Sequence, residues 1–168
     1  VFALDGGIYV AGSVITWMKD KMHLISDAKE TGELAESVPD TAGVCFVPAL
    51  TGLAAPYWDP YARGMLIGIT PGTERAHVVR AALESIAYQV RDILDLMEMD
   101  SGIRIRAMRV DGGITANEFL MQFQADILGI PVDVPEISET TALGVAYMAA
   151  YGSGLFKDLD EIEANWKL

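Results

Sequence analysis

A long run of helical periodicity in the middle of the chain does most to restrict the fold. Between Val78 and Met97, apolar residues recur every three or four positions and fall on one face of a helix. The sequence Pro-Gly-Thr-Glu at 71–74 makes a turn and marks the start of this helix. A helix of roughly 25 residues with a continuous apolar face needs packing partners along its length. We therefore expect it to be the main support of the domain.

Strand-like and helix-like segments alternate on both sides of this helix. Strands are predicted before Gly6 and at 44–48, 65–70, 103–110 and 131–134. Further helices are predicted through Met18, within 27–38, at 140–151 and from 158 onward. Another is predicted at 117–128, with Gly129 as its C-terminal cap. Segment 51–64 has prolines, aromatics and glycines without periodicity, which predicts an irregular loop held by its own side chains. The alternation indicates an α/β layered domain without an internal repeat.

The composition limits the classes of partner. With 168 residues, 51% of them hydrophobic, the chain has enough material for one buried core. Lys and Arg number 12 against 24 Asp and Glu, and the formal net charge is −12. Such a surface repels nucleic acid and anionic membranes. A small anion such as ATP can still be held locally by backbone N–H groups or a divalent cation.

The chain also shows no targeting or membrane signal. Its longest apolar stretch, from Tyr9, is about ten residues, too short for a bilayer, and lacks a basic leader. Cys45, in an apolar stretch, has no internal disulfide partner, and we expect it to be a small buried hydrophobe. A cytoplasmic location is the default expectation. Because the chain opens at Val1 rather than at a methionine, we expect a fragment of a longer protein.

Residues for metal binding or catalysis are sparse. His23 and His77 are far apart and neither lies in a metal-ligand motif, so no protein-held metal site is predicted. Asp111, after a predicted strand, could meet Mg²⁺ through water or satisfy loop N–H groups. There is no Ser-His-Asp pattern, no phosphate-binding P-loop motif and no general base. Binding is therefore better supported than catalysis.

The segment RVDGGITANEFLMQFQADILG carries the strongest local signal for a ligand. A strand delivers Gly112 and Gly113 to the start of a helix, where backbone N–H groups can approach a phosphate. Asn117, in the first turn, offers amide donors and an acceptor that suit a purine edge or a ribose. The alternative is a tight strand-to-helix turn in which Asn117 or Thr115 is a helix cap.

Two other helix starts contain glycine. Gly12 and Thr16 lie one helical turn apart, so a flat ligand could rest against Gly12 with Thr16 at its border. Helix packing explains Gly12 equally well. Thr140, Thr141 and Gly144 begin another helix, and we expect packing rather than ligand binding there.

Several of these segments together resemble the C-terminal domain of the glycerol kinases, in the FGGY family of carbohydrate kinases. The resemblance rests on DGGITANEFLMQFQADIL, TGLAAPYWDPYARGMLIGIT and LESIAYQVRDILDLMEMDSG, with FALDGGIYVAGSVITWMKD and PEISETTALGVAYMAA in matching order and spacing. It implies an actin-like, ribonuclease-H-like fold with a five-stranded mixed sheet flanked by helices. Residues 1–168 would form the C-terminal nucleotide-binding domain of a two-domain kinase, and ATP would lie in the cleft between the domains.

The resemblance also implies a set of cofactor-binding residues. Gly113 would lie against the phosphates of ATP, and Asn117 would contact the adenine side. Gly12 and Thr16 would border the adenosine pocket, although many relatives have Gln at the position of Thr16. No catalytic residue would lie in this chain.

The activity implied is transfer of the γ-phosphoryl group of ATP, with Mg²⁺, to glycerol, giving glycerol 3-phosphate. The glycerol-contacting residues, the catalytic aspartate and the phosphate loops would belong to an N-terminal catalytic domain upstream, so the isolated chain would be inactive. The complete enzyme would be a homo-oligomer without nucleic-acid or membrane partners. Two alternatives stay open: half of another FGGY sugar kinase such as xylulose kinase, which usually has Ser or a similar residue at the position of Asn117, or a non-catalytic actin-like nucleotide-binding module.

Overall fold

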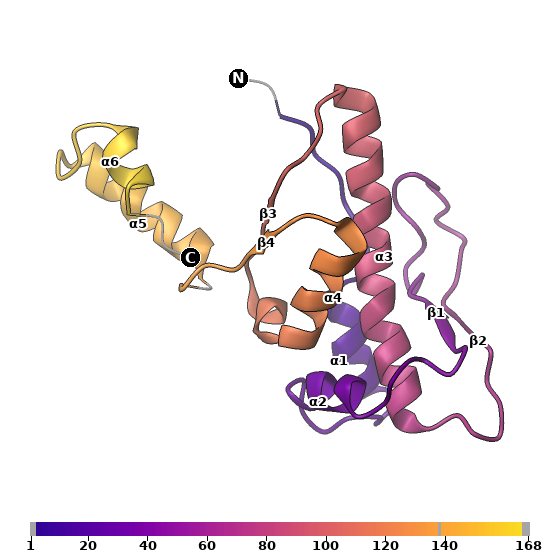
Figure 1. The fold of residues 1–168 in the computed structure, drawn as a ribbon. Helices are drawn as coiled ribbons and strands as arrows, with labels where there is room; N and C mark the ends of the chain where they lie inside the picture. Colours follow the sequence, from indigo (N-terminus) through magenta and orange to yellow (C-terminus); the bar gives the residue numbers. More distant parts are fainter. Residues whose placement is uncertain (1–2, 138, 166–168) are drawn as a thin grey trace.

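A single long helix forms the centre of the molecule. The computed structural model describes residues 3–137 and 139–165. Its longest element is α3 (Arg75–Ser101), with 27 residues, and it stands between the other helices and a β-hairpin (Figure 1). The helix ends at Gly102, which adopts the left-handed backbone conformation with φ at 67°. The predicted supporting helix is therefore confirmed.

Three helices pack on one side of α3 and close the core. They are α1 (Gly12–Asp20), α2 (Glu30–Glu36) and α4 (Glu118–Leu128). Gly129 ends α4 in the left-handed conformation, as the sequence predicts. The apolar side chains that these helices share with α3 and the segment before α1 are almost completely buried, among them Val10, Val14, Met18, Val79, Leu83 and Leu120.

The strands form two small sheets. The β1 strand (Cys45–Val47) pairs antiparallel with β2 (Met65–Ile67), and β3 (Met108–Arg109) pairs parallel with β4 (Val132–Asp133). The mixed α/β class is thus confirmed. The five-stranded mixed sheet that the resemblance implies is not, because the described residues contain two sheets of two strands each.

The strands are shorter than predicted, and the one expected before Gly6 is absent from the described residues. Segment 103–110 alternates apolar and polar residues, but only Met108 and Arg109 meet a neighbouring strand. Residues 3–5 form no strand, and Val1 and Phe2, where that strand was expected to begin, lie outside the described residues. The reason is physical: a strand needs the backbone of another strand beside it, and alternation along one segment does not supply this partner.

The prediction for Cys45 was wrong. The thiol is free and exposed, whereas we expected a buried side chain. Side chains alternate between the two faces of a strand, so the neighbour Phe46 lies on the inner face. There its ring packs against Trp17, with 6.0 Å between the ring centroids.

Segment 51–64 is the irregular loop that was predicted. The backbone N–H of Leu53 donates to the carbonyl of Asp59 at 2.8 Å and closes the loop on itself. Asp59 also uses Oδ1 to accept hydrogen bonds from two backbone N–H groups further along the loop. The hydroxyl of Tyr57 donates to Oδ2 of Asp92 on α3 at 3.0 Å. The loop is therefore held by its own groups and fastened to α3.

The last two helices lie to one side of the main body (Figure 1). They are α5 (Thr140–Gly152), which has no buried residue, and α6 (Leu159–Glu163). The predicted final helix is thus present, although 166–168 lie outside the described residues. Packing was the expected role of Gly144; a Cβ atom there would meet no atom within 4 Å among the described residues beyond its chain neighbours and its own helix backbone, so this role stays a prediction. Of the helices in the described ranges, none is both long and apolar enough to cross a bilayer.

Candidate functional site

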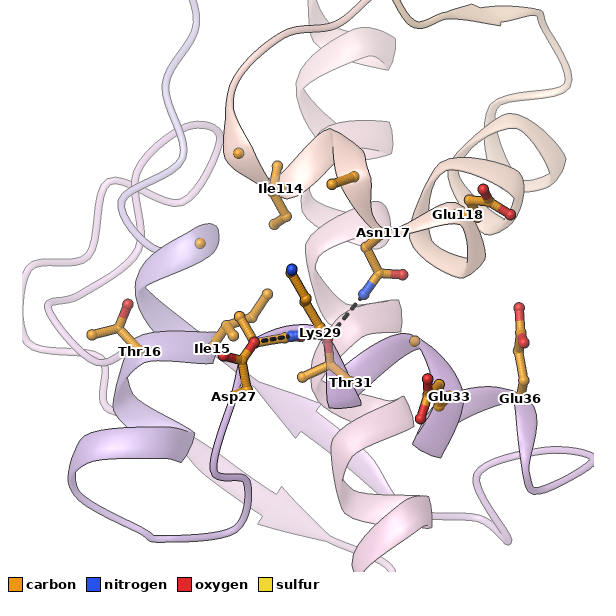
Figure 2. Close-up of a pocket in the computed structure, with 15 residues that line it drawn as sticks. Ile15, Thr16, Asp27, Lys29, Thr31, Glu33, Glu36, Ile114, Asn117 and Glu118 are labelled. Carbon is orange, nitrogen blue, oxygen red and sulfur yellow. Dashed lines mark hydrogen bonds between the residues drawn. The ribbon is translucent and has the colours of Figure 1, made fainter. Parts of the chain in front are cut away.

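A pocket of about 600 Å³ opens where α1, α2 and the start of α4 approach one another (Figure 2). Its lining includes Gly12 and Thr16 from α1 and Gly113 and Asn117 from the turn before α4. These are the four residues that the sequence predicts as a cofactor site, and the structure brings all four to one cavity. Their contact with a nucleotide stays a prediction.

The two adjacent glycines have different tasks. Gly112 has φ at 90° and ψ at 168°, a conformation that is essentially restricted to glycine, so the tight turn depends on it. Gly113 begins a short 3₁₀ helix, η1 (Gly113–Ala116), outside the positive-φ region. A Cβ atom on Gly113 would meet no described atom within 4 Å. Gly113 therefore leaves free space beside the pocket rather than serving the turn.

Asn117 is the helix cap that the sequence allowed. Its Oδ1 accepts a hydrogen bond from the backbone N–H of Leu120 at 2.9 Å, at the N-terminus of α4. Its Nδ2 donates to Oγ1 of Thr31 on α2, also at 2.9 Å. Thr31 is fully buried, and its own hydroxyl donates to the carbonyl of Ala28. One amide hydrogen of Asn117 stays available for a ligand.

Gly12 and Thr16 form the α1 side of the pocket. Gly12 is the first residue of α1, and a Cβ atom there would also meet no atom within 4 Å among the described residues outside its own helix. Among the described residues, no close helix packing requires a glycine at this position. Thr16 follows one turn later with an exposed side chain at the border of the pocket.

The α2 side of the pocket was missed. We predicted only a helix within 27–38 and no ligand contact there, yet this segment supplies much of the lining. Lys29 is the basic residue of the lining and extends toward Ile114 in Figure 2. Its ammonium group makes no hydrogen bond or ion pair with another described residue. The sequence did contain one signal for this wall, because a lysine and several carboxylates follow Gly12 and Thr16 along the chain. No local pattern, however, connects these residues to Gly113.

Carboxylates dominate the charge of the lining. They belong to Asp27, Glu33, Glu36 and Glu118. Within the described residues, no three His, Cys, Asp or Glu side chains are grouped closely enough to hold a metal ion. Asp111, the residue considered for Mg²⁺, accepts a hydrogen bond at Oδ2 from the hydroxyl of Thr140, and its contact with Mg²⁺ stays a prediction. The pocket thus offers open backbone, one cation and hydrogen-bonding groups, which suit binding.

Comparison with known proteins defines the class. Residues 1–153 match the C-terminal domain of the FGGY family of carbohydrate kinases. The chain belongs to this family.

Its similar relatives are glycerol kinases. The chain is 58% identical over 167 residues to glycerol kinase 2 of Thermotoga maritima, covering 99% of this chain and 34% of that protein. It is 56% identical to the glycerol kinase of Pseudothermotoga lettingae, again covering 99% of this chain and 34% of the relative. The chain therefore spans about a third of the length of the curated relatives it matches.

Solved structures give the same fold. The glycerol kinase of Plasmodium falciparum with ADP aligns with a TM-score of 0.84 and 40% identity, over 94% of this chain and 31% of that one. A xylulose kinase from Lactobacillus acidophilus aligns with a TM-score of 0.80 and 25% identity, over 96% of this chain and 33% of that one. The chain shares the fold of these kinases.

Proposed function

We propose that residues 1–168 are the C-terminal nucleotide-binding domain of a glycerol kinase, which transfers the γ-phosphoryl group of ATP to glycerol and gives glycerol 3-phosphate. The observation that carries this proposal is the meeting of Gly12, Thr16, Gly113 and Asn117 at one pocket, although 101 positions separate the first from the third. The similarity to glycerol kinases, at 58% identity for one of them, supports the choice of substrate. A glycerol kinase of the same fold was solved with ADP, and this supports the choice of an adenine nucleotide.

The charge of the lining restricts where the phosphates of the nucleotide can lie. Glu33, Glu36 and Glu118 lie at the opposite end of the pocket from Thr16 (Figure 2). Carboxylates repel phosphates, so the triphosphate would avoid that end. In the proposed arrangement the phosphates lie against the open backbone at Gly113. Gly12 and Thr16 on α1 would border the adenosine from one side, and the free amide hydrogen of Asn117 would face it from the other.

This domain would contribute binding and orientation to the reaction. In-line phosphoryl transfer depends mostly on positioning and on electrostatic stabilisation of the transferred group. The proton acceptor and the residues that contact glycerol are expected in an N-terminal catalytic domain outside these residues. Mg²⁺, when bound, would neutralise charge on the phosphates. The described residues do not form a site for it, so it would be held by the phosphates of the nucleotide.

We also propose the sheet, the cellular location and the oligomeric state of the complete enzyme. We expect the five-stranded actin-like sheet to be completed by strands outside the described residues, because β3 and β4 each pair with one neighbour only. A cytoplasmic, homo-oligomeric enzyme is expected from the family resemblance. The runner-up is a kinase for another sugar such as xylulose, since xylulose kinases share the fold at 25% identity.

The complete polypeptide that contains these residues provides the test. It should form ADP from ATP only when glycerol is added, with glycerol 3-phosphate as the second product. Xylulose should give no comparable turnover. Turnover with xylulose alone would favour the runner-up, and nucleotide binding without turnover on either alcohol would favour a non-catalytic module.

A further inference from the structure

Arg80 lies on α3 behind the pocket and contacts both helices that form its walls. It does not line the pocket itself. Its side chain is 16% exposed, and Nε donates to Oε1 of Glu84 at 2.8 Å. From this position the guanidinium group reaches α2 in one direction and α4 in another. Arg80 is therefore placed to relate the two walls without touching a ligand.

The contact with α2 is made at the end of that helix. One terminal nitrogen of Arg80 donates to the carbonyl of Ala35 in the last turn at 3.1 Å and to the carbonyl of Val38, just past the helix, at 2.6 Å. The last carbonyls of a helix have no donor within the helix, and a cation there also interacts favourably with the helix dipole. Because α2 has only seven residues, it depends strongly on such tertiary contacts for its position.

The contact with α4 is made at its first turn. The guanidinium carbon of Arg80 lies 5.0 Å from the ring centroid of Phe119, within the range of a cation–π interaction. Phe119 follows Asn117 and Glu118, which both line the pocket. Arg80 thus holds α4 directly beside Asn117 and Glu118, the residues of α4 and its cap that line the pocket.

A buried acid keeps the guanidinium group in place. Glu84 is 8% exposed, and its second oxygen accepts a hydrogen bond from the hydroxyl of Tyr88 at 3.4 Å. Burial, and then the carboxylate of Glu84, raise the pKa of Tyr88, so this hydroxyl stays neutral and able to donate. The planar guanidinium group can serve Glu84, two carbonyls and a ring at once, which an ammonium group cannot.

We propose that Arg80 is a positioning residue for nucleotide binding: by holding the end of α2 and the first turn of α4 it sets the spacing between the two walls of the pocket. This inference rests on the proposed function for the identity of the ligand. Arg80 touches no reacting atom, so it acts on the binding of the nucleotide in the ground state and the transition state alike.

Arg91 provides a matched control on the same helix. Its NH1 donates to the carbonyls of Ile127 and Leu128 at 3.2 Å each, and it pairs with Asp95 four residues later. Arg91 therefore holds α4 to α3 in the same chemical way, but at the opposite end of α4. Neither of those two carbonyl residues lines the pocket.

The experiment compares Arg80→Lys and Arg91→Lys in the complete polypeptide. For Arg80→Lys we expect the KM for ATP to rise about five- to tenfold, with kcat within about twofold of the unchanged protein. The KM for glycerol should not change. For Arg91→Lys the KM for ATP should stay the same even if the melting temperature falls. Equal effects of the two variants on the KM for ATP, or no effect of Arg80→Lys, would overturn the proposal.

A ligand-free measurement separates this inference from the proposed function. Amide hydrogen exchange of residues 30–36 should become faster in Arg80→Lys and not in Arg91→Lys, whatever reaction the protein performs. Unchanged exchange there would contradict the positioning role even in an active kinase. Absence of glycerol-dependent turnover in the unchanged protein would instead contradict the proposed function. If Arg80→Lys fails to fold, Glu84→Gln is the second variant. It weakens the hold on the guanidinium group and should therefore also raise the KM for ATP.

Discussion

The side-chain amide of Asn117 donates from Nδ2 to the buried Oγ1 of Thr31 at 2.9 Å, across 86 positions of sequence. The same side chain caps α4 through Oδ1. One residue thus begins a helix, joins two walls of the candidate nucleotide pocket and still has an amide hydrogen for a ligand. The pocket and the fold share this residue, so changes to it should affect both.

Asn117→Asp should separate the two structural tasks. A carboxylate keeps the cap on α4 but has no donor for Thr31, so one buried acceptor loses its partner at a cost of about 1–3 kcal/mol. Asn117→Ala also removes the cap and should cost about 1 kcal/mol more. Urea unfolding of the 168-residue chain measures both. Equal stability of Asn117→Asp and the unchanged protein would show that the bond to Thr31 contributes nothing.

Gly113→Val should weaken nucleotide binding in the complete polypeptide while leaving glycerol binding intact. The new side chain would occupy the space that we assign to the phosphates, so the KM for ATP should rise and kcat/KM fall by roughly tenfold or more. Gly112→Ala is the neighbouring control: its positive φ should make the variant less stable by about 1–3 kcal/mol. Melting temperature and ATP kinetics on the same preparations distinguish them. An unchanged KM in Gly113→Val would remove the phosphate contact from the proposal.

Lys29→Gln should reduce the affinity for ATP because it removes the basic side chain from a lining with four carboxylates. For a solvent-exposed charge the expected loss is about two- to fivefold in Kd, smaller at high salt. Lys19→Gln, near the end of α1 and away from the lining, is the matched control. Calorimetric titration with ATP at two salt concentrations provides the comparison. A similar loss in both variants would mean that net charge alone decides the affinity.

Tyr57→Phe should change how stability depends on alkaline pH. The hydrogen bond to Asp92, and then its negative charge, raise the pKa of Tyr57 from its ordinary value of 10.0. Because the pKa is higher in the folded state, the stabilisation is complete below the unfolded pKa and is lost as pH rises through the folded one. The stability difference between the unchanged protein and Tyr57→Phe should therefore be largest below pH 10.0 and shrink above it. Unfolding by urea across this range tests the sign, with exposed Tyr61→Phe as the control.

The purified 168-residue chain should show no glycerol kinase turnover by itself. The proton acceptor is proposed to lie in the N-terminal catalytic domain, and one wall of a cleft leaves a triphosphate largely in water. ATP affinity should then be in the millimolar range, about −4 kcal/mol. Turnover near the usual kinase scale of about 1–100 per second would disprove this expectation. Micromolar binding by calorimetry would instead indicate a self-sufficient site.

The sequence by itself determined the helical framework. The periodicity around Val78 predicted α3, and the apolar pattern with Gly129 predicted α4 and its end, because helix hydrogen bonds join residues only four positions apart. The resemblance to glycerol kinases selected Gly12, Thr16, Gly113 and Asn117 before any geometry was known. The helix predictions depend on short-range periodicity, and the site predictions depend on segments that match the family in order and spacing.

Only the tertiary structure decided which segments meet. Nothing near Lys29 or Thr31 in sequence indicates that α2 forms a wall of the pocket, since Asn117, the partner of Thr31, lies 86 positions away at the start of α4. The exposure of Cys45 and the shortness of the strands were equally hidden, because both depend on which backbone lies alongside. Local propensity is encoded within a few residues, whereas strand pairing and pocket walls arise from contacts between distant segments.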